Sequence, residues 1–274
     1  LTSFVKVLEF TERMIHQRFS MPRSLKGSSI SLYLRIVCIF VSGYNLCMPK
    51  IACELVELRL GIDGLEGTLA LPANIRPQPG QYLFGFALGQ SEALAVALFP
   101  AGPSGELMRV APPLPSSWAA GMQLQIRGPL GSGFRLPPGA RRVALAPLGC
   151  GPERLLPLAY LALAQDAAVA LFSSAIPDGL PSAVEIIPPE QLPDALDWAD
   201  YLALDLAQGW LARWQSAAGL REGQKLPFFG QALVRVPVAC GGLGECGVCA
   251  VRTRSGWSLA CKDGPVYDLA ELER

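Results

Sequence analysis

Apolar and polar residues alternate in short runs from Ile51 to about Arg135. Five such runs, IACELVELRL, GTLALP, QYLFGFAL, ALAVALFP and MQLQIRG, are separated by Pro- and Gly-rich segments such as PANIRPQPGQ. A period of two residues places alternate side chains on opposite faces of a strand. Short strands separated by Pro and Gly predict a small antiparallel barrel or sandwich.

The pattern changes at Arg141. RRVALAPL has the character of a buried strand, PERLLPLAYLALAQ that of a helix, and AAVALFSSA that of a second strand. The alternation continues later, in ADYLALDL and GWLARWQSAAG. Strands that alternate with helices in this way predict a small α/β domain with a parallel sheet.

These two patterns predict the domain organisation. We expect a β-barrel domain over residues 48–138 and an α/β domain over residues 139–235. A tail rich in cysteine follows over residues 236–274. The chain has 274 residues, of which 51% are hydrophobic and 17% charged, and this is enough apolar material for two modest cores.

Residues 1–47 have a different composition. Seven Lys and Arg stand against two Glu in residues 1–50, and the apolar run LYLRIVCIFV suggests a signal peptide or a membrane anchor. The run is too short to span a bilayer and contains Arg35, and no small-residue cleavage pattern follows it. We therefore expect residues 1–47 to be an upstream extension of the reading frame outside the fold, with an anchor or targeting segment as the alternative.

Charge and histidine content exclude several classes of function. The formal net charge is zero and the isoelectric point is near 6.8, whereas general binders of nucleic acid or anionic membranes need a basic surface. The only histidine is His16, so the body has no imidazole for a Ser–His pair, a Rieske-type cluster or a His-ligated metal. Electron transfer remains the better hypothesis.

Four cysteines near the C-terminus are close enough in sequence to share one inorganic centre. They are Cys240, Cys246, Cys249 and Cys261, with five, two and eleven residues between successive cysteines. A structural zinc site usually has two close-spaced pairs, and this segment has only one CxxC. Disulfides suit small secreted scaffolds. A [2Fe–2S] cluster is therefore favoured over zinc and over structural cysteines without metal.

Glycines between these cysteines supply a physical reason for the cluster. Gly241, Gly242, Gly244 and Gly247 lie within the segment CGGLGECGVC. Glycine adopts left-handed turns without steric cost, and such turns direct backbone N–H groups toward anionic sulfur.

The tail resembles a known family. From Cys240 through ACKDGPVYDLAEL it is similar to the cluster-binding tail of the electron transfer subunit of the NAD-dependent, two-subunit dihydroorotate dehydrogenase. Tails of that family carry a Cys-Lys-Asp-Gly-Pro motif, which is Cys261 to Pro265 in this chain. Weaker similarities are PGQY from Pro79, GPLGSGF from Gly128 and LGCGPERLLPLA from Leu148. The resemblance implies a ferredoxin reductase-like architecture: a flavin-binding barrel, a nucleotide-binding α/β domain and a C-terminal iron–sulfur tail.

The resemblance also implies cofactors and a partner. It implies a [2Fe–2S] cluster on the four cysteines, FAD on the barrel, and NAD at the turn that contains Gly149 and Gly151. For these two glycines, tight packing of the strand against the following helix is the alternative interpretation. The partner would be a flavin-containing catalytic subunit such as dihydroorotate dehydrogenase, in pyrimidine biosynthesis.

Two FAD signatures of the family are missing from the chain. ALAVALFPAG stands where the family has an Arg-Pro-x-Ser or Arg-x-Tyr-Ser type of strand, so the Arg and Ser that hold FAD are absent. RVAPPLPSSW replaces a Gly-x-Gly-Thr helix start, and its prolines have no N–H to offer a pyrophosphate.

Three functional hypotheses follow. The first is an oxidoreductase component, without substrate chemistry of its own, that passes electrons from NADH through FAD and the cluster to a flavin in a partner. The second is a degenerate reductase-like scaffold that keeps only the cluster, for one-electron relay or complex assembly. The third is an interaction module stabilised by zinc. Thiolate ligands predict a reducing, cytoplasmic setting.

Overall fold

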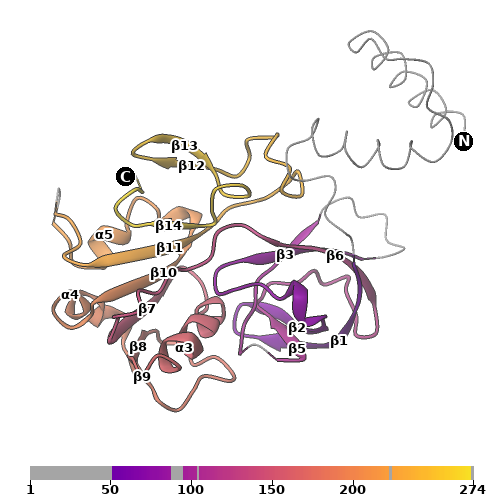
Figure 1. Cartoon of the computed structure of the whole chain (residues 1–274), viewed down its shortest axis with the longest axis horizontal. Coiled ribbons are helices and arrows are strands. Elements are labelled where there is room, and N and C mark those ends of the chain that lie inside the picture. Colours follow the sequence, from indigo (N-terminus) through magenta and orange to yellow (C-terminus); the bar gives the residue numbers. More distant parts are fainter. Residues whose placement is uncertain (1–50, 88–94, 104, 222–223, 273–274) are drawn as a thin grey trace, which may run out of the picture. The chain divides into compact units, whose positions relative to one another are not determined.

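The computed structural model describes residues 51–87, 95–103, 105–221 and 224–272 (Figure 1). The expectations for residues 1–47 therefore fall outside the described residues. No helix of the described residues is long and apolar enough to cross a membrane.

Six antiparallel strands form the first sheet, in the order β4-β3-β6-β1-β2-β5 (Figure 1). Their bounds are β1 Ile51–Gly61, β2 Gly64–Ala70, β3 Tyr82–Ala87, β4 Val96–Leu98, β5 Leu107–Val110 and β6 Gln123–Leu130, with a short 3-10 helix η1 at Ala73–Ile75. A bridge between Pro100 and Val110 joins the two edges of the sheet. The predicted small antiparallel barrel is confirmed.

A second six-stranded sheet has the order β14-β11-β10-β7-β8-β9. Strands β7 Arg142–Leu148, β8 Ala168–Phe172, β9 Val184–Ile187, β10 Tyr201–Ala207 and β11 Phe229–Arg235 pair in parallel, and β14 Val266–Asp268 pairs antiparallel with β11. The helical elements are η2 Glu153–Leu155, α3 Leu156–Leu163, η3 Pro189–Asp194, α4 Ala195–Trp198, η4 Gln208–Trp210 and α5 Trp214–Ala217. The predicted α/β architecture with a parallel sheet is confirmed.

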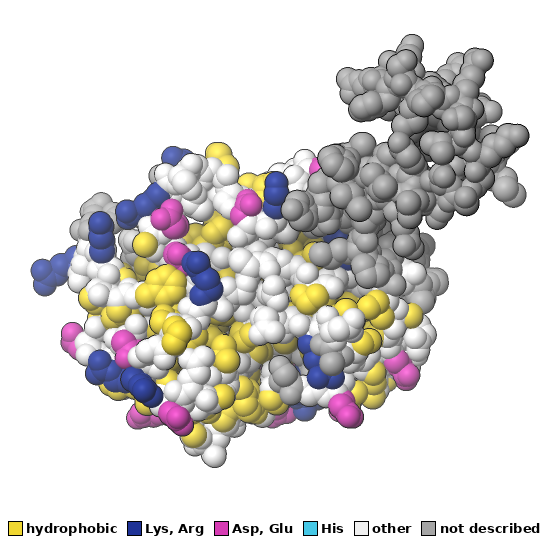
Figure 2. Space-filling model, viewed as in Figure 1, with side chains coloured by type: hydrophobic (Ala, Val, Ile, Leu, Met, Phe, Trp, Pro, Cys, Tyr) yellow, Lys and Arg dark blue, Asp and Glu magenta, His cyan; other side chains and the backbone are white. Residues whose placement is uncertain are grey.

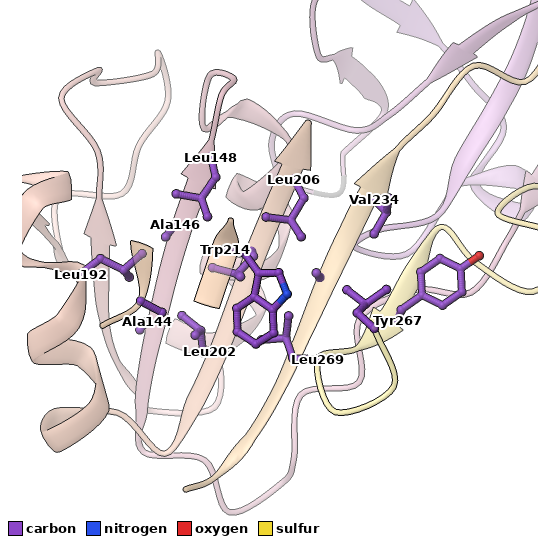
Figure 3. Close-up of a cluster of buried hydrophobic side chains, with 14 of the residues drawn as sticks. Ala144, Ala146, Leu148, Leu192, Leu202, Leu206, Trp214, Val234, Tyr267 and Leu269 are labelled. Atoms are coloured by element: carbon purple, nitrogen blue, oxygen red, sulfur yellow. The ribbon is translucent and has the colours of Figure 1, made fainter. Parts of the chain in front are cut away.

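Both faces of this sheet are covered, which explains why its strands have continuous apolar runs. Val143 and Leu145 of β7 belong to the core that includes α3. The alternate residue Ala146 belongs to a second core with Trp214 of α5, drawn in Figure 3. The tail also contributes to this second core, through Cys249 and Cys261 among others.

The tail is joined to the second sheet. After β11 the chain forms the cysteine loop, then a hairpin of β12 Ala250–Thr253 and β13 Gly256–Leu259, and then β14. In Figure 1 the yellow tail runs along the edge of the sheet beside β11, as the pairing of β14 with β11 requires. This attachment fixes the position of the last cysteine, because Cys261 lies between β13 and β14.

Candidate metal centre

The cysteine loop consists of consecutive glycine-dependent turns. Gly241, Gly242, Gly244 and Gly247 all have positive φ, between 63° and 83°. This left-handed conformation is unfavourable for other residues and confirms the conformational role predicted for these glycines.

Backbone N–H groups converge on the sulfur of Cys240. Burial alone would raise the pKa of this thiol, but the N–H groups of Gly244, Glu245 and Cys246 and the thiol of Cys246 donate to the sulfur and lower the pKa to about 6. Successive amides directed at one atom form an anion-binding concavity. Cys240 is therefore prepared to act as a thiolate ligand.

Cys249 and Cys261 form a second, buried pair. Cys249 is 1% exposed and Cys261 is 4% exposed. The β12–β13 hairpin brings them together, since Ala250 pairs with Leu259 and the Ala260 N–H donates to the Cys249 carbonyl oxygen at 3.0 Å. Burial raises the pKa of Cys261 to about 12, assisted by its hydrogen bond to Cys249 and by the charges of Cys249 and Cys240.

The Gly244 amide links the two cysteine pairs. Its N–H group interacts with the sulfur of Cys240 and with that of Cys261. The interactions that shift these pKa values pair Cys240 with Cys246 and Cys249 with Cys261, and the Gly244 amide contributes to both pairs. Within the described residues, no group of three or more His, Cys, Asp or Glu side chains is arranged so that it could hold a metal ion.

The donor chemistry fits an iron–sulfur cluster. Four thiols are soft ligands suited to iron–sulfur clusters or zinc, and amides directed at sulfur stabilise the negative charge of a cluster. Bound iron would also offset the burial and the mutual repulsion of thiolates, both of which raise the pKa of Cys261. All six cysteines of the described residues are free thiols.

The barrel holds the cysteine loop in place. Arg127 of β6 donates a hydrogen bond to the Gly241 carbonyl oxygen, and its guanidinium carbon lies 5.7 Å from the centroid of the Phe84 ring. A Cβ atom at Gly242 would lie 2.7 Å from that ring. Sequence analysis did not identify Arg127, because a lone arginine on a strand has no local signal for a contact 114 residues away.

Two motifs identified in the sequence meet in the fold. Ser132 of GPLGSGF forms a bridge with Pro265 of CKDGP, and the Ser132 N–H donates to the Gly264 carbonyl oxygen at 2.6 Å. Nearby, the hydroxyl of Tyr82, from the PGQY motif, donates to the Cys261 carbonyl oxygen at 3.5 Å. Residues of these two motifs therefore contact the segment from Cys261 to Pro265.

Gly149 and Gly151 lie in the turn between β7 and η2. Gly149 has a φ of +74°, which only glycine adopts readily. The Gly151 N–H donates to the carboxylate of Asp63. These contacts place the two glycines at a strand-to-helix turn, as expected from the sequence, with one amide already bonded within the chain.

In the segment that replaces the family's FAD helix start, two prolines stand between two bonded amides. Pro112 and Pro113 have no N–H, and the amides of Ala111 and Leu114 donate to carbonyl oxygens at 2.9 and 2.7 Å. In this described segment, no amide from 111 to 114 is left for a pyrophosphate. Residues 111–114 therefore do not fit the pyrophosphate of FAD.

A small cavity lies beside this segment. Its volume is about 180 Å³, and its lining includes Tyr82, Phe99, Arg154, Val238 and Ala260. Sites for drug-sized ligands usually enclose roughly 300 to 1,000 Å³, so this cavity does not accommodate a whole dinucleotide. Arg154 is bound internally, because it donates to the Pro112 carbonyl oxygen and pairs with Asp205 at 3.4 Å.

Comparison with known proteins assigns the tail to a family. Residues 238–273 match the iron–sulfur cluster binding domain of dihydroorotate dehydrogenase B. No curated protein is similar to the chain. The tail is therefore similar to an iron–sulfur cluster binding domain of this type.

Solved structures identify the fold. An NADH-dependent reduced ferredoxin-NADP oxidoreductase is similar with 17% identity and a TM-score of 0.64, over 81% of this chain and 89% of that chain. Phthalate dioxygenase reductase, described as transferring electrons from pyridine nucleotides to [2Fe–2S], has 14% identity and a TM-score of 0.50, over 76% and 87%. A mutant ferredoxin-NADP+ reductase from Plasmodium falciparum, with 2′P-AMP, has 8% identity and a TM-score of 0.51, over 70% and 100%.

At these identities the likeness establishes the fold. The resemblance inferred from the sequence is confirmed in both parts, since the body has a ferredoxin reductase-like fold and the tail has the cluster-binding domain.

Proposed function

We propose that the protein is an electron-transfer component that holds a [2Fe–2S] cluster on Cys240, Cys246, Cys249 and Cys261. The observation that carries the proposal is the approach of the cysteine loop to the segment with the last cysteine, since a Cβ atom at Gly244 would lie 3.8 Å from Lys262 and 3.9 Å from Leu259. When bound, a cluster of this kind accepts and releases single electrons.

The chain's own residues prepare the site. Amides of Gly244, Glu245 and Cys246 stabilise negative charge on sulfur, and Arg127 fixes the first turn of the loop. Burial of Cys249 and Cys261 excludes water from one side of the centre. Cys246 is exposed, so the other side is open to a partner.

The partner proposed is a flavin-containing catalytic subunit such as dihydroorotate dehydrogenase, with a role in pyrimidine biosynthesis. The family match of residues 238–273 supports this choice. On the face shown in Figure 2, Lys and Arg are interspersed with Asp and Glu, which does not favour nucleic acid as the partner. Free thiols favour a reducing compartment such as the cytoplasm.

Two forms of this function differ in the source of electrons. In one, electrons reach the cluster from NADH through FAD, and the ferredoxin reductase-like fold supports it. In the other, the scaffold keeps only the cluster. The engaged amides from 111 to 114 favour the second form, because the pyrophosphate of FAD has no donors there.

Anaerobic purification and cofactor analysis test the proposal. We expect two irons and two acid-labile sulfides per chain, visible absorption that bleaches on reduction, and an electron paramagnetic resonance signal from the reduced protein. Acid treatment that releases FAD supports the first form, and its absence supports the second. A colourless protein with one zinc per chain would contradict both and identify an interaction module.

A further inference from the structure

The second sheet has a topological switch point at the carboxyl ends of β7 and β10. From β7 the chain proceeds outward to β8 and β9 and then returns to β10 on the other side of β7. In open α/β sheets, ligands bind in the crevice at such a point. The turn with Gly149 and Gly151 follows β7 directly, so it lies at this crevice.

A tryptophan occupies one wall of the crevice. Trp210, in η4 directly after β10, lies so close to Gly149 that a Cβ atom at this glycine would overlap the indole nitrogen. The guanidinium carbon of Arg213 lies 4.8 Å from the centroid of the indole ring, and Arg213 also donates to the Gly209 carbonyl oxygen at 3.1 Å. The indole is therefore held over the turn.

A carboxylate occupies the position at which a phosphate would accept a hydrogen bond. Asp63 belongs to the turn between β1 and β2 of the barrel, 88 residues away from Gly151, and it accepts the Gly151 N–H. An anion on a glycine amide at the start of a helical segment is the interaction that these turns offer to phosphates. Here the chain itself supplies the anion.

Carboxyl groups also gather beside this turn. Glu153 is 2% exposed, and its pKa is raised by burial first and by the charges of Asp63 and Glu66, against the lowering effect of Arg154 and its own backbone. The positive groups nearby already have partners within the chain. Arg235 donates to the Gly149 carbonyl oxygen and pairs with Asp205, which also pairs with Arg154.

We propose that Asp63 and Trp210 close this crevice, so that the protein does not bind a nicotinamide nucleotide. The consequence of this closure rests on the proposed function. If no nicotinamide nucleotide binds, the cluster is reduced by a one-electron donor, such as a protein with an iron–sulfur centre. One electron leaves the donor and one arrives at the cluster, without bond formation or proton transfer.

Titration with NADH, followed by nucleotide fluorescence and by calorimetry, tests the closure. The wild type is expected to show no saturable binding. The double variant Asp63→Ala with Trp210→Ala is expected to bind NADH saturably, at least about tenfold more tightly than the weakest binding that the titration detects. The matched control is Asp194→Asn with Trp257→Ala, which changes an exposed carboxylate and a 72% exposed tryptophan and should behave as the wild type does.

Saturable binding by the wild type would overturn the proposal, as would a folded double variant that gains no affinity. If circular dichroism shows that the double variant is unfolded, Asp63→Ala alone replaces it. This single variant removes only an exposed carboxylate and should also bind NADH more tightly.

The same samples distinguish failure of the proposed closure from failure of the proposed cluster function. With the cluster present, reduced methyl viologen should produce the electron paramagnetic resonance signal and NADH should not, with or without added FAD. A full cluster that NADH reduces overturns the closure and leaves the cluster function intact. Absence of iron and sulfide overturns the cluster function, while the NADH titration still decides whether the crevice is closed.

Discussion

The guanidinium of Arg127 donates a hydrogen bond to the carbonyl oxygen of Gly241 and joins β6 of the barrel to the first turn of the cysteine loop. This contact connects parts of the chain that are 114 residues apart. The loop is therefore positioned by the barrel as well as by its own glycines.

Arg127→Gln should weaken this connection. Hydrogen bonds from charged groups contribute roughly 1.5 to 3 kcal/mol, so we expect a loss of stability within this range. The removal of a positive charge near the cluster should also lower its reduction potential, measured by a redox titration followed with electron paramagnetic resonance. Arg221→Gln, at an exposed position, is the control and should change neither quantity. An unchanged potential in Arg127→Gln would contradict the positioning role.

Gly242→Ala and Gly247→Ala separate backbone strain from a packing clash. Both glycines have positive φ, so each alanine should cost about 1 to 2 kcal/mol. At Gly242 the added Cβ also meets the Phe84 ring at 2.7 Å, whereas at Gly247 nothing lies within 4 Å. Chemical denaturation should therefore show a larger loss for Gly242→Ala, by about 1 to 3 kcal/mol. Equal losses would mean that the loop does not pack on the barrel.

Glu153→Gln should change how stability depends on pH. Burial raises the pKa of Glu153 above its ordinary value of 4.5, so the folded state holds its proton more tightly than the unfolded state does. This contribution favours folding below pH 4.5 and is lost as the pH rises through the raised folded pKa. The variant should be more stable than the wild type at neutral pH, in urea denaturation measured from pH 4 to pH 8. A difference between the two proteins that does not vary with pH would contradict this assignment.

Trp214→Ala tests the core on which the tail packs. Trp214 is 3% exposed in the core that includes Cys249 and Cys261 (Figure 3). Its removal should cost about 3 to 5 kcal/mol and reduce retention of the cluster. Trp257→Ala is the matched control, because this side chain is 72% exposed and should change stability by less than about 0.5 kcal/mol. Thermal denaturation and iron content measure both effects.

Local patterns predicted much of the fold. The strands of the barrel and the order of barrel, α/β sheet and tail follow from alternation and from Pro and Gly, which act within a few residues. The positive φ of Gly241, Gly242, Gly244 and Gly247 also follows from composition, because no other residue adopts this conformation as readily.

Contacts between distant segments were not predictable. The pairing of β14 with β11 depends on a strand of only three residues after the cysteine motif. The bond between Asp63 and Gly151 joins residues in different sheets, and an aspartate in a turn is ordinarily a turn former. GWLARWQSAAG forms only the short η4 and α5, and Trp210 of η4 lies against Gly149.

Electron paramagnetic resonance of the reduced protein, compared among cysteine variants, tests the central claim most directly. The wild type and Cys53→Ser, which changes a buried thiol of the barrel core, should each give about one spin per chain. Each single serine variant of Cys240, Cys246, Cys249 and Cys261 should lose or alter this signal, with a corresponding loss of iron. A signal that is unchanged in Cys261→Ser would contradict the account, because the tail would then not bring the four sulfurs to one centre.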